Sequence, residues 1–217
     1  MEFKDRREAG KLLAEPLKKY KGQKVIVFAL PRGGVVTASE IAKELRAPLD
    51  LMLAHKIGHP YQPEYAIAAI SEGGLVIENR AEVESVDPEW YAHAQANEME
   101  EMQRKRNVYM KGRKEPPVQD AIAILVDDGI ATGLTMKAAI LELKHRKPKK
   151  LVVAVPVAPH TTAQTIESMV DEFIGFHVPM EGLFRGAIGA YYRDFTQTGD
   201  DEVISLLEEN ENLLHAT

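Results

Sequence analysis

The sequence predicts an α/β fold: a mostly parallel twisted sheet flanked by helices, with an inserted helix and a small C-terminal cap. Three aliphatic runs, at residues 24–30, 121–126 and 151–157, are typical of strands buried on both faces. Each run is followed by a segment in which apolar residues recur at helical spacing. Strands that alternate with helices indicate βαβ units, which form parallel sheets. Ligands of such sheets bind at the carboxyl ends of the strands, so the loops there are the first candidates for a site.

The order of the elements follows from apolar periodicity and from its interruptions. Apolar positions at helical spacing run from Phe3 to Leu17, and Pro16 predicts a break in this first helix. Residues 35–45 and 136–143 each place apolar side chains on one helical face, directly after a buried strand. The other predicted elements are a strand at 50–54, a hairpin of 65–71 and 75–77, a helix at 161–170 and a strand at 172–176.

Two segments are expected to lie outside this alternating core. Residues 86–114 are polar, open with an Asp-Pro pair typical of a helix start and close near a glycine, which predicts a solvated helix inserted between core strands. Residues 178–217 carry four aromatic side chains and a helix capped by Asp200, and are expected to form a small cap over the site. We therefore expect a single domain, residues 1–217, with these two additions.

The composition excludes several classes of protein. The 217 residues include no cysteine, which excludes disulfides, thiolate catalysis and cysteine-ligated zinc. The net charge of −6 does not indicate a nucleic-acid-binding surface. No apolar run approaches the length that spans a bilayer, and the charged N-terminus lacks the apolar core of an export signal. We therefore expect a cytoplasmic protein that binds neither nucleic acid nor a membrane.

The segment after the central aliphatic run, residues 127–135, is the strongest candidate for a binding site, and we call it the acid-pair loop. Asp127 and Asp128 stand where the preceding strand should end, and small residues lead from them into a helix. Backbone N–H groups at a helix start, together with nearby Thr hydroxyls, suit a phosphate. Two carboxylates would repel that phosphate, so they are expected to face vicinal sugar hydroxyls with a divalent cation nearby. The loop therefore predicts a receptor for a phosphorylated sugar.

The acid-pair loop resembles the 5-phosphoribosyl-1-pyrophosphate (PRPP) signature of the type I phosphoribosyltransferases. That signature is a hydrophobic strand, an acidic pair, two further residues and a Thr/Gly-rich loop. The resemblance implies that Asp127 and Asp128 hold the ribose hydroxyls and act in catalysis. It also implies that the rest of the loop binds the substrate and its 5-phosphate, through Gly129, Ile130, Ala131, Thr132, Gly133, Leu134 and Thr135. The simpler alternative, a strand–turn–helix with one capping Asp, explains only one of the two carboxylates.

A second phosphate-binding candidate follows the first aliphatic strand, at Leu30-Pro31-Arg32-Gly33-Gly34. Two glycines allow the backbone to approach a ligand closely, and an arginine can chelate a phosphate through two parallel hydrogen bonds. In the type I family this position binds pyrophosphate, and the resemblance gives that role to Arg32, Gly33 and Gly34. Taken alone, the same residues also fit an ordinary turn. Neither loop matches the nucleotide triphosphatase or dinucleotide-binding patterns.

Basic residues elsewhere in the chain are further candidates. The resemblance implies that Lys56 neutralises the pyrophosphate leaving group, and the alternative is a solvated loop lysine. His55 and His59 are candidates for acid–base chemistry or a metal pair, although two loop histidines without a third ligand are more often structural. In the inserted helix, Lys105 and Arg106 are either delivered to the pyrophosphate on closure or belong to a solvated, salt-bridged face.

By resemblance, these residues predict a magnesium-dependent phosphoribosyltransferase. It would transfer the 5-phosphoribosyl group of PRPP to a nitrogen nucleophile, a nucleobase or related base, and release pyrophosphate, with Mg²⁺ held mainly by PRPP. Homodimers are common in this family, so a homodimer is expected. Ala131 stands where hypoxanthine-guanine phosphoribosyltransferases carry a third Asp, and an alanine cannot act as a base, which argues against their 6-oxopurine mechanism. Aromatic residues of the cap would either stack on the base or form the cap's own core: Phe184, Tyr191, Tyr192 and Phe195.

Two other functions stay compatible with the same residues, because a fold does not fix a function. One is a non-catalytic regulatory module that binds PRPP or a nucleotide, and the other is a phosphosugar hydrolase on the same scaffold. Most of the chain also resembles a set of bacterial members of the family that have no assigned substrate. That wider resemblance is carried by the acid-pair loop, by Pro31-Arg32-Gly33-Gly34, by Lys56-Ile57-Gly58 and by Val155-Pro156-Val157-Ala158-Pro159.

Overall fold

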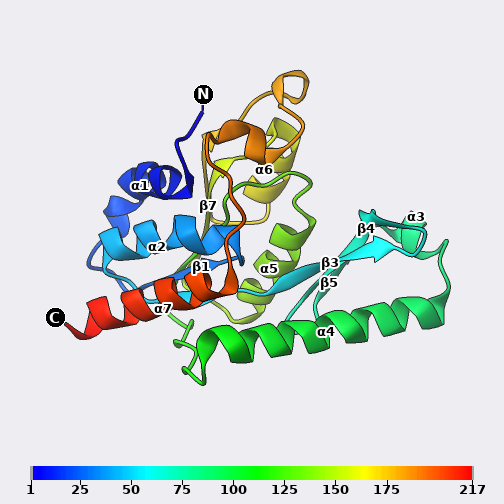
Figure 1. Ribbon diagram of the computed structural model, residues 1–217, viewed down its shortest axis with the longest axis horizontal. Helices are drawn as coiled ribbons and strands as arrows, with labels where there is room; N and C mark the ends of the chain where they lie inside the picture. The colour runs from blue at the N-terminus through cyan, green and yellow to red at the C-terminus, as the bar shows by residue number, and fades with distance from the viewer. Residues whose placement is uncertain (1, 217) are drawn as a thin grey trace.

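The computed structural model describes residues 2–216, and its core is a five-stranded parallel sheet in the order β2-β1-β6-β7-β8 (Figure 1). Neighbouring strands of this sheet all run parallel. Every residue of β1 and β6 is buried, as their aliphatic runs predict. The predicted α/β fold is therefore confirmed. The strands are β1 (Val25–Ala29), β2 (Leu49–Leu51), β6 (Ile122–Val126), β7 (Lys150–Val157) and β8 (Glu172–His177).

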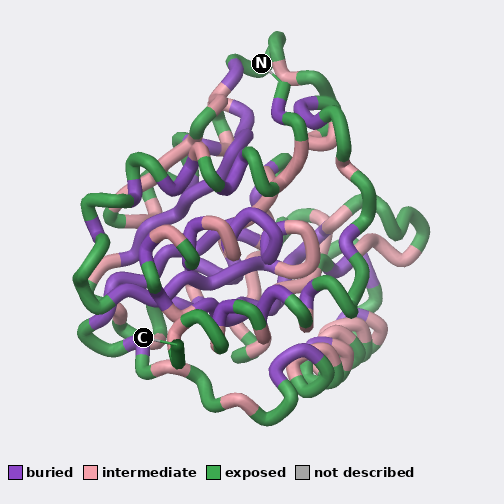
Figure 2. The backbone as a smooth tube through the Cα atoms, turned by 60° about the vertical axis from the view of Figure 1, so that its left-hand side comes forward, coloured by how far each residue is buried: buried purple, intermediate pink, exposed green. Residues whose placement is uncertain are grey.

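Helices cover both faces of the core sheet. Alternate strand residues point to opposite faces, so Val27 packs in one apolar cluster and Phe28 in the other. Figure 2 shows the buried residues concentrated in the centre of the molecule. Within residues 2–216, no helix is long and apolar enough to cross a bilayer. The first face is covered by α1 (Arg6–Leu17), α2 (Gly33–Leu45) and α7 (Asp200–His215), and the second by α5 (Leu134–His145) and α6 (His160–Glu167).

A second, antiparallel sheet forms an arm that projects from the core (Figure 1). A long helix, α4, runs along this arm, and an apolar cluster that includes Ile57, Ile67 and Met102 joins the two. The structure thus contains the predicted hairpin and the predicted inserted helix. The elements of the arm are β3 (Ala54–His59), β4 (Gln62–Ser71), β5 (Val76–Glu78), α3 (Arg80–Val83) and α4 (Pro88–Met110).

The strand predicted at residues 50–54 is wrong in its extent. β2 ends at Leu51 and β3 begins at Ala54 in the other sheet, because the chain crosses here from the core to the arm. Consequently His55 and Lys56, for which the sequence predicts a loop, lie on a strand. The apolar side chains continue without interruption across the crossing, so periodicity alone does not mark the boundary.

Two helix ends also differ from their predictions. α1 retains Pro16 in its last turn and passes into the short 3₁₀ helix η1 (Lys18–Tyr20) instead of breaking at the proline. Asp200, expected as the cap of the last helix, is its first residue, and Gly199 holds the cap position. The carboxylate of Asp200 instead accepts a hydrogen bond from Tyr109.

The N-terminal segment and the residues before α7 lie side by side. The chain passes through two short 3₁₀ helices, η2 (Glu181–Leu183) and η3 (Ile188–Tyr191), on its way to α7. The N–H of Phe3 donates to the C=O of Tyr191 (2.7 Å), and Phe3 shares an apolar cluster with Tyr192 at the end of β7. These two parts of the chain therefore meet beside the carboxyl edge of the core sheet.

Candidate active site

The carboxyl ends of β1 and β6 bring the acid-pair loop next to residues 30–34, which we call the arginine loop. β1 and β6 are neighbours, with Ala29 aligned to Val126. The N–H of Leu30 donates to the C=O of Val126 at 3.0 Å. The two predicted phosphate-binding loops therefore share one edge of the sheet, where ligands of parallel sheets bind.

Two glycines bring the arginine loop into contact with the acid pair. A Cβ atom on Gly33 would overlap the carboxylate of Asp128 and approach the guanidinium of Arg6. A Cβ atom on Gly34 would lie 2.9 Å from Oδ1 of Asp127. Glycine is thus required at both positions by the close approach of the two loops.

Asp128 is held from two sides. Nε of Arg6 donates to its Oδ2 (2.6 Å), and the hydroxyl of Tyr192 donates to its backbone C=O (2.7 Å). Arg6 also donates to the C=O of Thr196 (2.8 Å) and lies over the ring of Phe195. The side chains of Arg6 and Asp128 are only 10% and 16% exposed. Arg6 is a site residue that the sequence does not predict, because an arginine in the first turn of an amphipathic helix carries no motif.

Asp127 is partly buried beside the charge of Asp128. Its Oδ1 accepts a hydrogen bond from the backbone N–H of Asp128 at 2.8 Å. Burial, and after it the carboxylate of Asp128, raise the pKa of Asp127 well above its ordinary value. A carboxylate in such surroundings gains from a cation or from hydroxyl donors, which is the use expected of the acid pair.

The first half of the acid-pair loop is fixed by backbone contacts. Gly129 has φ of +153°, and the space next to its Cα is filled by the side chain of Ile188 in η3. Ile130 is buried, and its N–H donates to the C=O of Val157 at the end of β7 (2.9 Å). A side chain at position 129 would therefore have to displace Ile188.

The second half of the loop opens α5 and has the geometry of an anion site. Gly133 has φ of +78° and precedes Leu134, and no side chain caps this helix in the described part of the chain. The first N–H groups of a helix have no acceptor within it, so those of Leu134 and Thr135 are available to an anion. Ala131 and Thr132 are exposed, which leaves the loop open to solvent.

Arg32 lies at the rim of the same edge. It follows a cis peptide bond after Pro31 and directly precedes α2. Its NH1 is 3.3 Å from Oδ1 of Asp200, and the hydroxyl of Tyr109 donates to the same oxygen at 2.8 Å. The Tyr109 hydrogen bond, together with the charge of Arg32, lowers the pKa of Asp200. Arg32 therefore faces a carboxylate of α7 in this structure.

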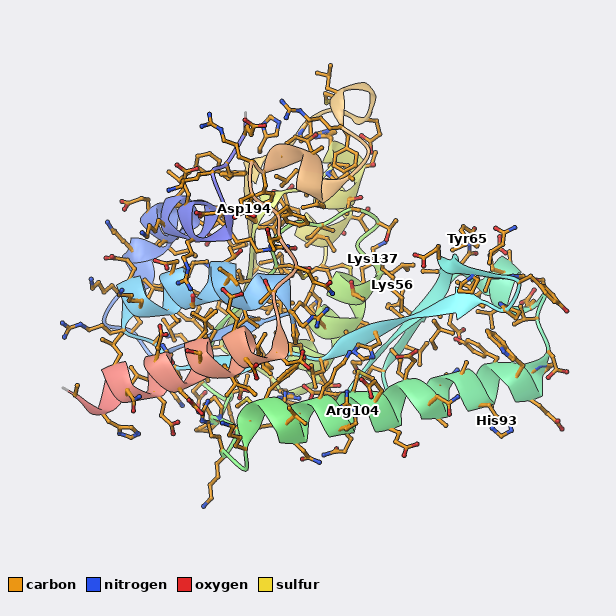
Figure 3. The ribbon with its side chains drawn as sticks, in the orientation of Figure 1. Lys56, Tyr65, His93, Arg104, Lys137 and Asp194 are labelled. Carbon is orange, nitrogen blue, oxygen red and sulfur yellow. The ribbon has the colours of Figure 1, made fainter. Side chains whose placement is uncertain are left out.

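Lys56 lies on the arm and not on either of the two predicted phosphate-binding loops. It is exposed on β3, opposite Ala69 of β4. Figure 3 shows Lys56 where the arm meets α5, close to Lys137 in that view. Its predicted role at the pyrophosphate stays a prediction.

The remaining basic candidates already have hydrogen-bond or ion-pair partners within the protein; they are His55, His59 and Arg106. Nδ1 of His55 is 2.7 Å from Oε2 of Glu98, and Nδ1 of His59 accepts from a nearby backbone N–H. No three metal-ligating side chains come together anywhere in residues 2–216, which argues against the histidine metal pair. The side chain of Arg106 is only 14% exposed and forms ion pairs with three carboxylates, so it already has a structural role.

The four aromatic residues of the cap pack on one another. The rings of Phe184 and Tyr191 are 5.8 Å apart, and those of Tyr192 and Phe195 are 4.9 Å apart. Tyr191 and Tyr192 are buried. Of the two interpretations, these contacts favour the cap's own core over base stacking.

A family model described as "Phosphoribosyl transferase domain" matches residues 3–185, and the chain belongs to this family. Two Mycobacterium tuberculosis proteins, named "Putative phosphoribosyl transferase MT0597" and "Putative phosphoribosyl transferase Rv0571c", are 40% identical to it over 208 residues. The match covers 95% of this chain and 46% of theirs, so the chain spans about half the length of these curated relatives.

Solved structures share the fold. The crystal structure of TT1426 from Thermus thermophilus is similar with a TM-score of 0.80 and 36% identity, covering 96% of this chain and 99% of that one. The AQ2163 protein from Aquifex aeolicus is similar with a TM-score of 0.51 and 14% identity, covering 93% and 84%. The arm and the core therefore recur together in at least one known protein of nearly equal length.

Proposed function

We propose that the protein is a Mg²⁺-dependent phosphoribosyltransferase. It transfers the 5-phosphoribosyl group of PRPP to a nitrogen nucleophile, a nucleobase or a related base, and releases pyrophosphate. The observation that carries this proposal is the packing of Gly33 and Gly34 against Asp127 and Asp128. This contact sets the arginine loop beside a carboxylate pair that itself leads into an open helix start. PRPP carries pyrophosphate, vicinal hydroxyls and a 5-phosphate, which match these three features in chemistry.

In the proposed reaction, the bond from the anomeric carbon to the pyrophosphate oxygen breaks, and its electron pair leaves with pyrophosphate. The nitrogen nucleophile forms the new bond to that carbon, and its proton passes to solvent water. Asp127 and Asp128 hold the ribose hydroxyls, and the start of α5 holds the 5-phosphate, which aligns the reacting groups. Arg32, Lys56 and the backbone N–H groups of the arginine loop stabilise the charge that builds on the leaving group.

The acid pair fits a magnesium ion that arrives with the substrate. Mg²⁺ is usually bound by one or two carboxylates together with substrate phosphates rather than by a cage of protein ligands. Asp127 and Asp128 supply two carboxylates, and the described residues offer no group of three ligands that would hold a metal alone. When bound, the ion would neutralise charge on the pyrophosphate and ribose oxygens.

The acceptor is expected to be a base that needs no carboxylate at position 131. Ala131 is exposed, and its C=O accepts a hydrogen bond from Oγ1 of Thr162 (2.9 Å). A side chain without a titratable group cannot take the proton of the nucleophile. This supports an acceptor other than the 6-oxopurines.

The test is pyrophosphate release from PRPP and Mg²⁺ across a panel of purines, pyrimidines and simple amines. We expect release that depends on one class of acceptor. Asp128→Asn keeps the shape of the side chain but removes its charge, and it should reduce the rate by at least about 100-fold. An Asp128→Asn rate equal to wild type would contradict the role of the acid pair.

One observation favours a second candidate, a regulatory module that binds PRPP without turnover. Arg6 already neutralises Asp128 through a short ion pair, so this carboxylate is engaged before any substrate arrives. The two candidates differ in outcome: a regulatory module would bind PRPP but release no pyrophosphate with any acceptor. Hydrolysis of a phosphosugar without an acceptor would instead support the third candidate.

The proposal extends to the setting of the enzyme. We propose a cytoplasmic homodimer, built from one domain per chain, whose ligands are PRPP and a base. The net charge of −6 supports the absence of a nucleic-acid partner. Sedimentation velocity of the purified chain tests the dimer, and a monomer at all concentrations would contradict it.

A further inference from the structure

An open cavity of about 340 Å³ lies outside the edge strand β2, where the end of α4 meets α7 (Figure 1). Ion pairs of Lys111 with Glu208 (2.8 Å) and of Arg113 with Glu211 (2.7 Å) join the two helices there. Within residues 2–216, none of its lining residues belongs to the acid-pair loop or the arginine loop. Small-molecule sites usually measure roughly 300 to 1,000 Å³, so this cavity is large enough to hold a ligand of its own.

One side chain that lines the cavity is the carboxyl group of Asp50, the central residue of β2. The C=O of Pro48 and the N–H of Met52 both bond to β1. Backbone groups two residues apart on a strand face the same way, so the backbone of Asp50 also faces β1. Asp50 therefore reaches the cavity with its side chain. In agreement, its Oδ1 accepts the N–H of Leu51 (2.6 Å), which lies on the outer edge of the strand.

The second oxygen of this carboxyl group has no partner. Oδ2 of Asp50 is buried and makes no hydrogen bond within the described part of the chain, whereas Oδ1 has Leu51 and also Arg106 at 3.4 Å. A buried carboxylate oxygen without a donor costs free energy, which a ligand that donates to it would recover. Burial raises the pKa of Asp50 despite the charge of Arg106, as expected of a carboxylate with too few partners.

The carboxylates around Asp50 outnumber the cations that pair with them. The guanidinium groups of Arg106 and Arg146 are shared among four carboxylates at the junction of the arm and the core. An additional cation beside Asp50 would reduce this excess of negative charge. The four carboxylates are those of Asp50, Glu72, Glu115 and Glu142.

The rest of the wall favours a ligand with an apolar body. Leu49 of β2, Met110 of α4 and Leu207 of α7 all line the cavity and are nearly fully buried. At the rim, the charge of Arg113 is offset by Glu211 at 2.7 Å. The cavity thus combines an unpaired carboxylate oxygen with apolar contacts from three elements.

We propose that this cavity binds a small organic cation with an apolar body. Its nitrogen donates to Oδ2 of Asp50, and its apolar part packs against Leu49, Met110 and Leu207. Because these residues come from β2, α4 and α7, the ligand would hold the helix of the arm against the core. The proposal does not depend on the function proposed above.

The experiment compares three probes of nearly equal shape by calorimetry: benzamidine, a cation, benzamide, a neutral N–H donor, and benzoate, an anion. Benzamidine should bind at least about tenfold more tightly than benzamide, because a hydrogen bond between two charged groups is the stronger one. Benzoate should not bind, since it would face the carboxylate of Asp50. Equal binding of benzamidine and benzoate would overturn the proposal.

Asp50→Asn keeps the shape of the side chain and removes its charge. It should weaken benzamidine binding at least about tenfold and change benzamide binding little. Asp201→Asn is the matched control, because it removes an exposed carboxylate of α7 that does not line the cavity. Equal effects of the two substitutions would mean that benzamidine responds only to the net negative charge of the chain, and the proposal would fail.

Leu214→Trp provides a test that leaves Asp50 intact. Leu214 lines the cavity near the end of α7, so a larger side chain there should fill the space and abolish benzamidine binding. Thermal unfolding of each variant shows whether it is folded, and Leu214→Trp decides the case if Asp50→Asn is not. Unchanged binding by folded Leu214→Trp would overturn the proposal. The absence of benzamidine binding to the wild type at millimolar concentration would overturn it too, and would mean that the cavity holds water only.

Discussion

Asp127 and Asp128 place two carboxylates side by side at the end of a buried strand, where their repulsion opposes folding. Arg6 offsets the charge of Asp128 through an ion pair of 2.6 Å, whereas Asp127 accepts a backbone hydrogen bond from Asp128. Gly33 and Gly34 then close the arginine loop over the pair. Two mutually repelling carboxylates in a loop at a sheet edge are typical of a functional site, because the packing of the fold alone does not require them there.

Gly33→Ala tests whether this contact matters for chemistry. The added Cβ atom would displace the Asp128 carboxylate, and a misplacement of about 1 Å in a positioning group can cost about 100-fold in rate. We expect a loss of this size in kcat/KM for PRPP, measured by pyrophosphate release. Gly182→Ala is the control, because a Cβ atom there meets nothing within 4 Å. Equal activity of the two variants would show that the loops need not touch.

Asp127→Asn should stabilise the protein at neutral pH while abolishing PRPP binding. The pKa of Asp127 is raised in the folded state by burial and by Asp128, so the folded protein holds this proton to higher pH than the unfolded chain does. Stability is therefore lost as pH rises through the folded-state pKa. The variant should melt higher than wild type at pH 8, and the difference should shrink as pH falls toward about 4, the ordinary carboxyl pKa. Thermal unfolding across this pH range checks it, and a difference independent of pH would refute the assignment.

Arg106, a largely buried cation of helix α4, ties this helix to the core. Arg106 contacts Glu72 of the arm and lies 3.4 Å from Asp50 of β2, whose side chain is only 1% exposed. Glu72 retains a second partner, Arg146 (3.2 Å), so the loss of Arg106 would chiefly affect Asp50. Burial raises the pKa of Asp50 although Arg106 opposes this. The arm and the core are thus joined by charge as well as by apolar packing.

Arg106→Met should lower the free energy of unfolding by about 3 kcal/mol, because it leaves the buried carboxylate of Asp50 without its cation. Urea denaturation at pH 7 measures this loss. Arg104→Met, on the same helix but exposed, should change it by less than about 0.5 kcal/mol. Similar effects of the two substitutions would mean that the buried network does not anchor the arm.

Several elements are predictable from the sequence because their signals are local. The aliphatic runs of β1, β6 and β7 mark strands buried on both faces, and the acid-pair loop carries its own order of strand, carboxylates and helix start. The start of β3 is not predictable in this way, because the apolar side chains continue through the crossing between sheets. The ion pairs of Arg6 and Arg106 are also hidden from the sequence, because the carboxylates they bind come from distant elements and such contacts exist only after folding.

At the scale of the whole molecule, two segments that are far apart in sequence meet beside the candidate active site. Residues 3–6 and 188–196 join through backbone hydrogen bonds, including the N–H of Arg193 to the C=O of Phe3 (2.8 Å) and the N–H of Asp194 to the C=O of Lys4 (2.9 Å). Both parts also hold Asp128, through Arg6 and Tyr192. A ligand that binds the acid pair should therefore restrain both parts at once.

Hydrogen exchange with and without PRPP and Mg²⁺ measures this coupling. We expect slower exchange in residues 3–6 and 188–196 as well as in the acid-pair loop, because ligand contacts to Asp128 oppose the local opening that exchange requires. The tip of the arm, residues 60–66, is largely exposed and serves as the internal control, where no change is expected. Protection confined to the acid-pair loop would show that the two parts open independently of the ligand. Slower exchange in both parts would mean that the N-terminal segment belongs to the binding site, because its hydrogen bonds would then be stabilised when a ligand binds the acid pair.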